Sequence, residues 1–393
     1  MPPRDDHNLV IYHIGGDGDY GPAMAIARRF PKITTVVVFD AREDTDDRLQ
    51  AETIPGTRNS PRVIAINRCV DETIGDTDFY VNKFPLSSSL LPISRLGATE
   101  DPVYSHCRTW AENAELDHVV RLKTTTIDHV VAMGVAPPPD VISIDAQGAE
   151  LRILRGANET LRSHALAVVS EIEFSEIYGG QALFDDQMRE LTAMGFRFCE
   201  IQNSQHWHPG PAMGLGFHTV GEALWFRYCG DFQGGRPPAR GAVDYRTLSG
   251  AMLIRLATIA FAFGRLSYVI TLLSFVAKSY PDHFTQAFHD PNLKPLLRLH
   301  AHYVEHLAHY EQDHRFFIDA GKHQLERLLA ELDDTPSAGA TGARSPSTEV
   351  ELLQAQITTL NTTLTQFQNS ASWRITWPLR ALKQLLRRLV GVA

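Results

Sequence analysis

Three carboxylates stand where buried strands are expected to end. Asp145 falls in the apolar run 140–146 (DVISIDA), and Glu171 and Glu173 close the run 165–173 (ALAVVSEIE). Open α/β sheets bind their ligands at the carboxyl ends of parallel strands. Side chains two positions apart share one face of a strand, so Glu171 and Glu173 point the same way. A carboxylate there can act as a general base or bind a substrate, or it can simply cap a turn.

Histidines supply a fourth candidate base. His206 lies in QHWHPG, in the loop expected after the sixth strand, and imidazole titrates near neutral pH. An ordinary surface loop is the alternative. A second group of histidines, between His283 and His323, has no HExxH or comparable pairing with acids, so we interpret it as a polar helix face and expect no metal site.

A glycine-rich loop indicates where a cofactor would bind. Residues 16–21 (GDGDYG) match GxGxxG between an expected strand at 9–14 and an expected helix at 21–30. Glycines let the backbone turn tightly and approach a ligand. Asp40 ends an expected strand and suits the two hydroxyls of a ribose. The candidate cofactor-binding residues are Gly15, Gly16, Asp17, Gly18, Gly21, Asp40 and Asp71. Asp71 is the candidate for contact with the edge of the adenine.

The order of these elements predicts a doubly wound α/β fold with about seven mostly parallel strands. The glycine loop and Asp40 alone suit a nicotinamide cofactor and S-adenosylmethionine equally. Expected strands cover residues 9–14, 34–40, 62–67, 140–146 and 165–173, with 196–202 and 223–228 as a last antiparallel pair. Expected helices cover 126–133, 149–162 and 181–194, and residues 79–95 are expected to form a loop, with short strands as the alternative.

Several segments together resemble the FkbM family of methyltransferases. Residues 140–157 (DVISIDAQGAELRILRGA) match the family's IDxxGxExxxLxGA, and 171–184 (EIEFSEIYGGQALF) match its acidic strand and Y-x-G-Q-x-x-F. The loop IGGDGDYG at 14–21 and FDA at 39–41 fit the same pattern. Further matches are a serine pair within Ser87-Ser88-Ser89-Leu90 and a T-[LI]-D at Thr126-Ile127-Asp128.

The resemblance covers roughly residues 8–228 and implies a Rossmann-like class I methyltransferase fold that uses S-adenosylmethionine. Two positions depart from the family pattern. Ser143 stands where a lysine is usual, and His13 stands where an acidic residue is frequent, which puts in doubt a contact to the methionine amino group from that position.

The expected reaction is O-methylation of a sugar hydroxyl in a surface glycan or its precursor. A hydroxyl needs a general base within hydrogen-bond reach, which is why Asp145, Glu171, Glu173 and His206 are the catalytic candidates. Two alternatives stay open. A NAD(P)-dependent sugar oxidoreductase would explain the glycine loop and Asp40, and a non-catalytic scaffold for glycan-assembly enzymes would explain Ser143 and His13.

Composition excludes several classes of protein. The chain has 393 residues and a formal net charge of −9 at pH 7, so it lacks the basic excess typical of nucleic-acid binders. Its four cysteines are scattered without a CxxC pair, which favours a reducing cytoplasm. The N-terminus shows no apolar signal core. The best candidate for a membrane span, residues 248–277, is interrupted by Arg255 and Arg265, so its uncharged runs fall short of the roughly 18 residues that a span needs.

Changes in composition divide the chain into four parts. Residues 1–238 form the predicted S-adenosylmethionine-dependent methyltransferase domain, which ends in a stretch rich in Gly and Pro. Residues 239–334 form a predicted helical accessory domain. A low-complexity flexible linker follows at 335–348, and a coiled-coil-like helix with a basic amphipathic tail occupies 349–393.

The C-terminal part predicts two further contacts. Apolar residues at heptad spacing over 349–369 favour self-association. Residues 370–393 carry five basic and no acidic side chains, with leucines on one helical face, a pattern typical of a helix lying on an anionic membrane. Docking on the chain's own helical domain is the alternative. SWRITWPLR resembles a tail of bacterial surface-glycan enzymes, which favours a peripheral place on the inner face of the cytoplasmic membrane.

Overall fold

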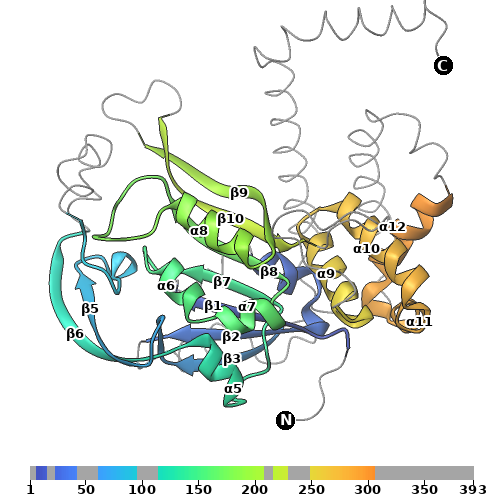
Figure 1. Ribbon diagram of the computed structural model, residues 1–393, viewed down its shortest axis with the longest axis horizontal. Helices are drawn as coiled ribbons and strands as arrows, with labels where there is room; N and C mark the ends of the chain where they lie inside the picture. Colours follow the sequence, from blue (N-terminus) through green and yellow to red (C-terminus); the bar gives the residue numbers. More distant parts are fainter. Residues whose placement is uncertain are drawn as a thin grey trace, which may run out of the picture. The chain divides into compact units, whose positions relative to one another are not determined.

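A seven-stranded sheet built from apolar, β-branched runs is the frame of the structure (Figure 1). The computed structural model describes residues 6–15, 23–41, 61–94, 114–207, 216–228 and 248–305. The strand order is β3-β2-β1-β7-β8-β10-β9. The strands are β1 (Leu9–Gly15), β2 (Thr34–Asp40), β3 (Arg62–Asn67), β7 (Val141–Asp145), β8 (Ala167–Glu173), β9 (Phe196–Trp207) and β10 (Phe217–Arg227). This order confirms the predicted Rossmann-like α/β fold.

Strand direction places the carboxyl ends of the parallel strands at one edge. The first five strands in this order pair in parallel, whereas β10 runs antiparallel to both β8 and β9. Side chains on β1 alternate between the two faces of the sheet. Val10, Tyr12 and Ile14 join one apolar cluster with α-helical residues such as Ile127 and Leu151. Loss of this apolar area from water is the main term that stabilises the sheet and its helices.

One helix that the sequence predicts as continuous is divided into two in the structure. The expected helix over 149–162 is two helices, α6 (Glu150–Arg155) and α7 (Asn158–Ser163). The break falls at Gly156, where a Cβ would lie 2.3 Å from the carbonyl oxygen of Asp71, so the backbone of another segment packs against this glycine. The other helices of this part are α1 (Met24–Arg29), α5 (Ile127–Ala132) and α8 (Phe184–Ala193), with 3-10 turns η1 (Pro31–Ile33) and η2 (Pro85–Ser87).

A second, three-stranded sheet takes in the start of the segment 79–95, where a loop with possible short strands is expected, because one of its strands runs on to Asn82. Its order is β4-β6-β5, formed by β4 (Cys69–Val70), β5 (Gly75–Asn82) and β6 (Leu116–Thr125). β5 and β6 pair antiparallel from Gly75 with Thr124 to Asn82 with Leu116. Figure 1 shows this pair beside the large sheet, apart from the C-terminal helices.

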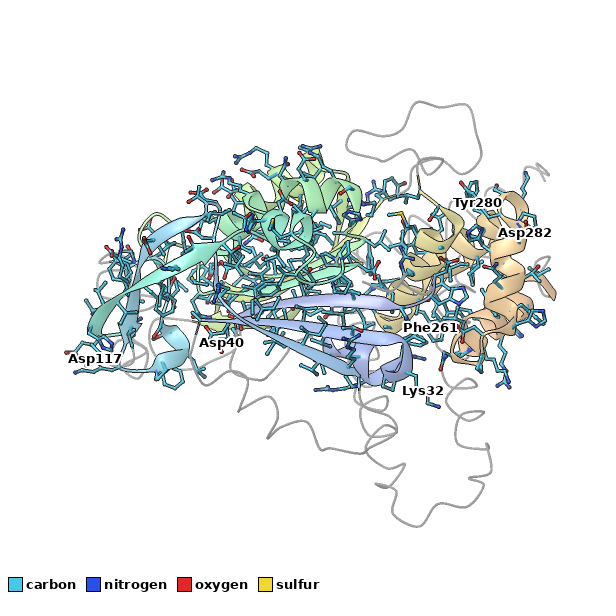
Figure 2. All side chains as sticks on the ribbon, turned by 90° about the horizontal axis from the view of Figure 1, so that it is seen from below. Lys32, Asp40, Asp117, Phe261, Tyr280 and Asp282 are labelled. Atoms are coloured by element: carbon cyan, nitrogen blue, oxygen red, sulfur yellow. The ribbon has the colours of Figure 1, made fainter. Side chains whose placement is uncertain are left out.

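The helices after the sheet pack at the edge opposite the carboxyl ends. They are α9 (Gly250–Ala262), α10 (Leu266–Ser279), α11 (Pro281–His289) and α12 (Lys294–Glu305), with the 3-10 turn η5 (Pro291–Leu293). Phe261 on α9 meets Phe30 with ring centroids 6.3 Å apart, and Tyr268 donates its hydroxyl hydrogen to the carbonyl oxygen of Arg227. Figure 2 shows Asp40 at the other end of the sheet from Phe261.

Contacts join residues 1–301 into one compact unit, and 302–393 form a second unit, of which the structure describes only 302–305. The predicted boundary near 238 falls between described segments and stays a prediction. The predicted linker (335–348), coiled-coil-like helix (349–369) and tail (370–393) lie outside the described residues. Among described helices, none is long and apolar enough to cross a membrane.

A buried ion pair links α9 to the start of β7. Nε of Arg255 lies 2.9 Å from Oδ1 of Asp140, and the two side chains are 12% and 1% exposed. The other carboxylate oxygen of Asp140 accepts a hydrogen bond from the amide of Val10 at 2.8 Å. One carboxylate therefore ties together two central strands and the helical segment.

We expect Arg255→Ala to lower the free energy of unfolding by about 3 kcal/mol, because it leaves the carboxylate of Asp140 buried without its cation. Chemical denaturation of the purified chain measures the loss. Arg189→Ala is the control, since Arg189 pairs with Asp185 and Asp186 on the surface and should cost less than about 1 kcal/mol. Equal losses in the two variants would contradict this assignment.

Candidate active site

One cavity of about 610 Å³ lies between the carboxyl edge of the large sheet and the small sheet. Its volume is in the range of small-molecule sites. β1, β2, β7 and β8 supply the residues at their carboxyl ends: Gly15, Asp40, Asp145, Glu171 and Glu173. The small sheet and the segment after it supply a largely apolar wall: Phe79, Val81, Phe84, Leu86, Val120 and Leu122. Five predicted site residues therefore border a single cavity.

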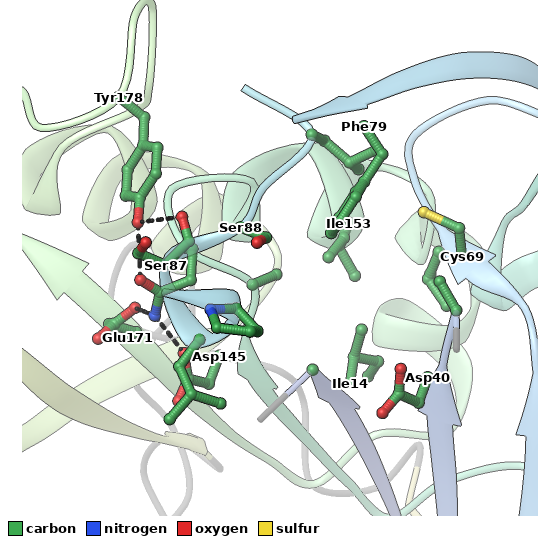
Figure 3. Close-up of a pocket in the computed structure, with 18 of the residues that line it drawn as sticks. Ile14, Asp40, Cys69, Phe79, Ser87, Ser88, Asp145, Ile153, Glu171 and Tyr178 are labelled. Carbon is green, nitrogen blue, oxygen red and sulfur yellow. Dashed lines mark hydrogen bonds between the residues drawn. The ribbon is translucent and has the colours of Figure 1, made fainter. Parts of the chain in front are cut away.

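An amide joins two of the predicted carboxylates (Figure 3). Gln147 donates from Nε2 to Oδ1 of Asp145 at 2.8 Å and to Oε2 of Glu171 at 3.0 Å. Its Oε1 accepts the hydroxyl hydrogen of Tyr178 at 2.8 Å. Gln147 and Tyr178 are not among the predicted site residues, although both lie inside the motifs at 140–157 and 171–184. Neither titrates near neutral pH, so residue type alone gave no signal.

The turn between β7 and α6 holds these groups in place. Oε1 of Glu150 accepts hydrogen bonds from the amides of Ala146 at 2.8 Å and Gly148 at 3.1 Å. Gly148 has φ +90°, and a Cβ on it would lie 2.9 Å from the ring of Tyr178. The motif glycine is therefore required by the close approach of an aromatic ring, and the motif glutamate by the amides of the turn.

Other motif residues also build structure. Oε1 of Gln181 accepts the amide hydrogens of Ile177 and Tyr178, which orders the loop that carries the tyrosine. Ser89 donates its hydroxyl hydrogen to the carbonyl oxygen of Gln147 at 2.7 Å. Asp128 caps α7, with one carboxylate oxygen 2.8 Å from the amide nitrogen of Thr160. These residues position the cavity wall.

Burial changes the acidity of the carboxyl groups around this turn. Burial, together with the neighbouring carboxylates of Asp145, Glu173 and Glu150, raises the pKa of Glu171 well above its usual range. Burial also raises the pKa of Glu173, which is 1% exposed and whose Oε2 has no hydrogen-bond partner. The pKa of Glu150 is raised to about 7, mainly by burial. A carboxyl with a raised pKa at a ligand site is suited to accepting a proton near neutral pH.

Two predicted cofactor-binding residues, Asp40 and Gly15, lie at the other end of the cavity. Asp40, at the end of β2, is half-buried and lines the cavity beside Cys69 and Val70. Gly15 has φ +78°, and a Cβ on it would lie 1.9 Å from the carbonyl oxygen of Asp145. β1 and β7 approach this closely because the side chain is missing. The loop residues Gly16, Asp17, Gly18 and Gly21 lie outside the described residues.

Two predicted site residues lie away from this cavity. Asp71 follows β4, and Arg152 on α6 binds its carboxylate through two hydrogen bonds of 2.9 and 2.6 Å. His206 pairs across the β9–β10 ladder with His218, with Nε2 atoms 3.2 Å apart, whereas the adjacent Gln205 lines the cavity. Contact of Asp71 with an adenine and a catalytic role for His206 stay predictions.

The two departures from the family pattern lie side by side. His13 on β1 and Ser143 on β7 are register partners, and Nδ1 of the imidazole is 3.2 Å from the serine hydroxyl oxygen. Both residues are at most 3% exposed. A buried histidine needs a polar partner, and a serine in place of a lysine provides one without adding a second buried charge.

Comparison with known proteins identifies this part of the chain. Residues 44–198 match the model of the methyltransferase FkbM domain. The segment 44–198 is therefore similar to an FkbM methyltransferase domain. No curated protein matches the chain. The solved magnesium protoporphyrin IX methyltransferase from Synechocystis PCC 6803, with bound SAM, covers 57% of this chain and 72% of its own, at 10% identity and a TM-score of 0.28.

S-adenosylmethionine is the cofactor of the FkbM domain, and the cavity fits it. Asp40 would accept hydrogen bonds from the ribose hydroxyls, and Cys69 and Val70 offer an apolar border for the adenine. The sulfonium is a cation, and Arg68 is the one basic side chain among the described lining residues, whereas four are acidic. This excess of acidic over basic side chains favours a positively charged ligand.

We expect Asp40→Ala to weaken S-adenosylhomocysteine binding about tenfold to a hundredfold, because two hydrogen bonds to a charged acceptor are lost. Calorimetric titration measures the affinity, and thermal unfolding checks that the variant is folded. Asp78→Ala is the matched control, since Asp78 is exposed on β5, where it pairs with Arg121 of β6. Unchanged affinity in a folded Asp40→Ala variant would show that the ribose binds elsewhere.

Proposed function

We propose that the FkbM domain transfers a methyl group from S-adenosylmethionine to a hydroxyl oxygen of a sugar, in a surface glycan or its precursor. The observation that carries this proposal is the single cavity that reaches from Asp40 at one end to Glu171 and Glu173 at the other. A cofactor held at Asp40 and an acceptor held near these glutamates would share that space.

The lining supports a neutral, hydroxyl-rich acceptor. Side chains that exchange hydrogen bonds with hydroxyls stand at the acidic end: Ser87, Ser88, Gln147, Tyr178 and Gln205. Phe79 and Phe84 face the same cavity and suit the apolar face of a sugar ring. An anionic acceptor, such as a diphosphate-bearing sugar placed with its phosphates here, would be repelled by the acidic side chains of the cavity.

The chain's own residues supply the proton chemistry. S-adenosylmethionine, when bound, provides a methyl group on a good leaving group. Glu171 would take the proton of the acceptor hydroxyl, so that the O–H bond breaks as the new O–CH3 bond forms. Gln147 would hold the carboxylate of Asp145 beside the carboxyl group of Glu171 as Glu171 takes up the proton. Glu173, buried with a free oxygen, would accept a hydrogen bond from another hydroxyl of the acceptor.

The experiment that tests this function combines binding and turnover. S-adenosylhomocysteine should bind with micromolar affinity, and NAD and NADP should not. Purified chain with methyl-labelled S-adenosylmethionine and a panel of neutral glycosides, amino sugars and sugar phosphates should transfer label to a neutral glycoside. Label on an amine or a carboxyl group would show that the enzyme methylates that group instead of a hydroxyl. Binding of a nicotinamide cofactor alone would replace the methyltransferase with the oxidoreductase.

Glu171→Gln should lower kcat/KM about 10²- to 10⁴-fold, because the amide cannot accept the hydroxyl proton. In the wild type, a base with a raised pKa must lose its proton before it can act. We therefore expect kcat/KM to rise tenfold per pH unit up to that pKa and to level off above it, and we expect this rise to vanish in the variant.

Glu176→Gln is the control for Glu171→Gln, since Glu176 is an exposed glutamate three residues beyond β8. It should keep both the rate and the pH profile. A Glu171→Gln variant that retains the wild-type profile would remove Glu171 as the base and leave Asp145 and Glu173 as candidates.

A further inference from the structure

Gln147 has a backbone conformation that its residue type disfavours. Its φ is +54°, and among the described residues Asn203 is the other non-glycine with positive φ. Asparagine is enriched in this region because its short side chain bonds locally, whereas glutamine has no such advantage. Gln147 and Gly148 both have positive φ, as in turns where Asn-Gly or Gly-Gly is usual. Local backbone preference therefore does not explain a glutamine here.

The contacts of Gln147 explain what glutamine adds. Its side chain joins three segments: Asp145 at the end of β7, Glu171 on β8, and Tyr178 in the loop after β8. Ser89, after η2, donates to its backbone carbonyl oxygen and so brings in a fourth segment. An asparagine or aspartate side chain is shorter by one methylene and cannot span the same set of partners from this backbone.

The partners also fix which way the amide points. Carboxylate oxygens accept hydrogen bonds, so the Nε2 hydrogens must face Asp145 and Glu171. The hydroxyl of Tyr178 then donates towards Oε1 of Gln147 or to the carbonyl oxygen of Ser87, 3.1 Å away. The reversed amide would place its oxygen against two carboxylates. Figure 3 shows these bonds as dashed lines that run from the amide of Gln147 to Tyr178, Asp145 and Glu171 beside the cavity.

We propose that Gln147 is a positioning residue that holds the carboxyl groups of Asp145 and Glu171 as a fixed pair, and that its left-handed backbone is retained because only this conformation lets the amide reach both. The proposal deepens the function proposed above, since it assigns the residue that prepares the base. Backbone strain at a ligand-lining residue, held by surrounding contacts, is typical of such a device.

The amide opposes the effect of its acidic surroundings. Groups that face Glu171 are Asp145 from β7, Glu150 from α6, Glu173 from β8 and the hydroxyl of Tyr178, and the three carboxylates favour its protonated form. A donor shared between Asp145 and Glu171 favours the ionised form instead. Without it, the pair should keep its proton to higher pH, and the carboxyl groups should lose their common orientation.

The test reads the carboxyl groups directly and needs no acceptor. Infrared difference spectroscopy of the full chain during a pH titration follows the carbonyl band of protonated side-chain carboxyls. In Gln147→Met, which keeps the length and removes the donor, the midpoint of the buried carboxyls should move up by about one pH unit or more. Gln147→Gly should show the same change with an unchanged or raised Tm, because glycine adopts this backbone without strain.

Asn203→Gly is the matched control, since Asn203 has φ +47° on β9, bonds to half-buried Glu222 and does not line the cavity. It should leave the infrared midpoint unchanged. If both Gln147 variants titrate as wild type, or if Gln147→Gly lowers Tm without moving the midpoint, Gln147 is merely structural and the proposal is overturned. Absence of methyl transfer to any acceptor would count against the proposed function alone and would leave this titration interpretable.

Discussion

The buried carboxylate of Glu150 is the contact on which the site depends. It accepts two amide hydrogens of the β7–α6 turn while only 1% exposed, so the turn has one conformation. That conformation sets the two positive φ angles at Gln147 and Gly148. Tyr178 then packs on Gly148, and its hydroxyl reaches the amide of Gln147. Removing one buried acceptor would therefore release the carboxylate pair, the aromatic wall and the loop together.

The large sheet and most of the site follow from local sequence patterns. Apolar β-branched runs mark the strands because buried parallel strands are apolar on both faces. Strand ends then place Asp40, Asp145, Glu171 and Glu173 at one edge, and the structure puts all four on one cavity. Each of these inferences uses neighbours along the chain, and for that reason the sequence alone supports them.

The parts that sequence reasoning missed depend on contacts between distant segments. β6 (Leu116–Thr125) alternates weakly and is largely exposed, and its partner β5 lies more than thirty residues earlier, so no local pattern reveals the small sheet. The ion pair of Asp71 with Arg152 on α6 likewise joins segments far apart in the chain, and no local pattern indicates it. Gln147 is uncharged and looks like any turn residue in the sequence. Its role depends on hydrogen-bond partners on β7, on β8 and in the following loop.

The acidic site also weakens the fold that carries it, in a way that depends on pH. Glu150 has a pKa raised from 4.5 to about 7, so the fold prefers its protonated form. Below pH 4.5 both folded and unfolded chains hold the proton, and this preference is fully expressed as stability. Between 4.5 and 7 the unfolded chain releases the proton first, so stability falls, and above 7 the loss is complete. Glu171 and Glu173 shift in the same direction. A cationic ligand that binds only the folded chain would offset this loss at neutral pH, which links the stability of the domain to occupancy of its cavity.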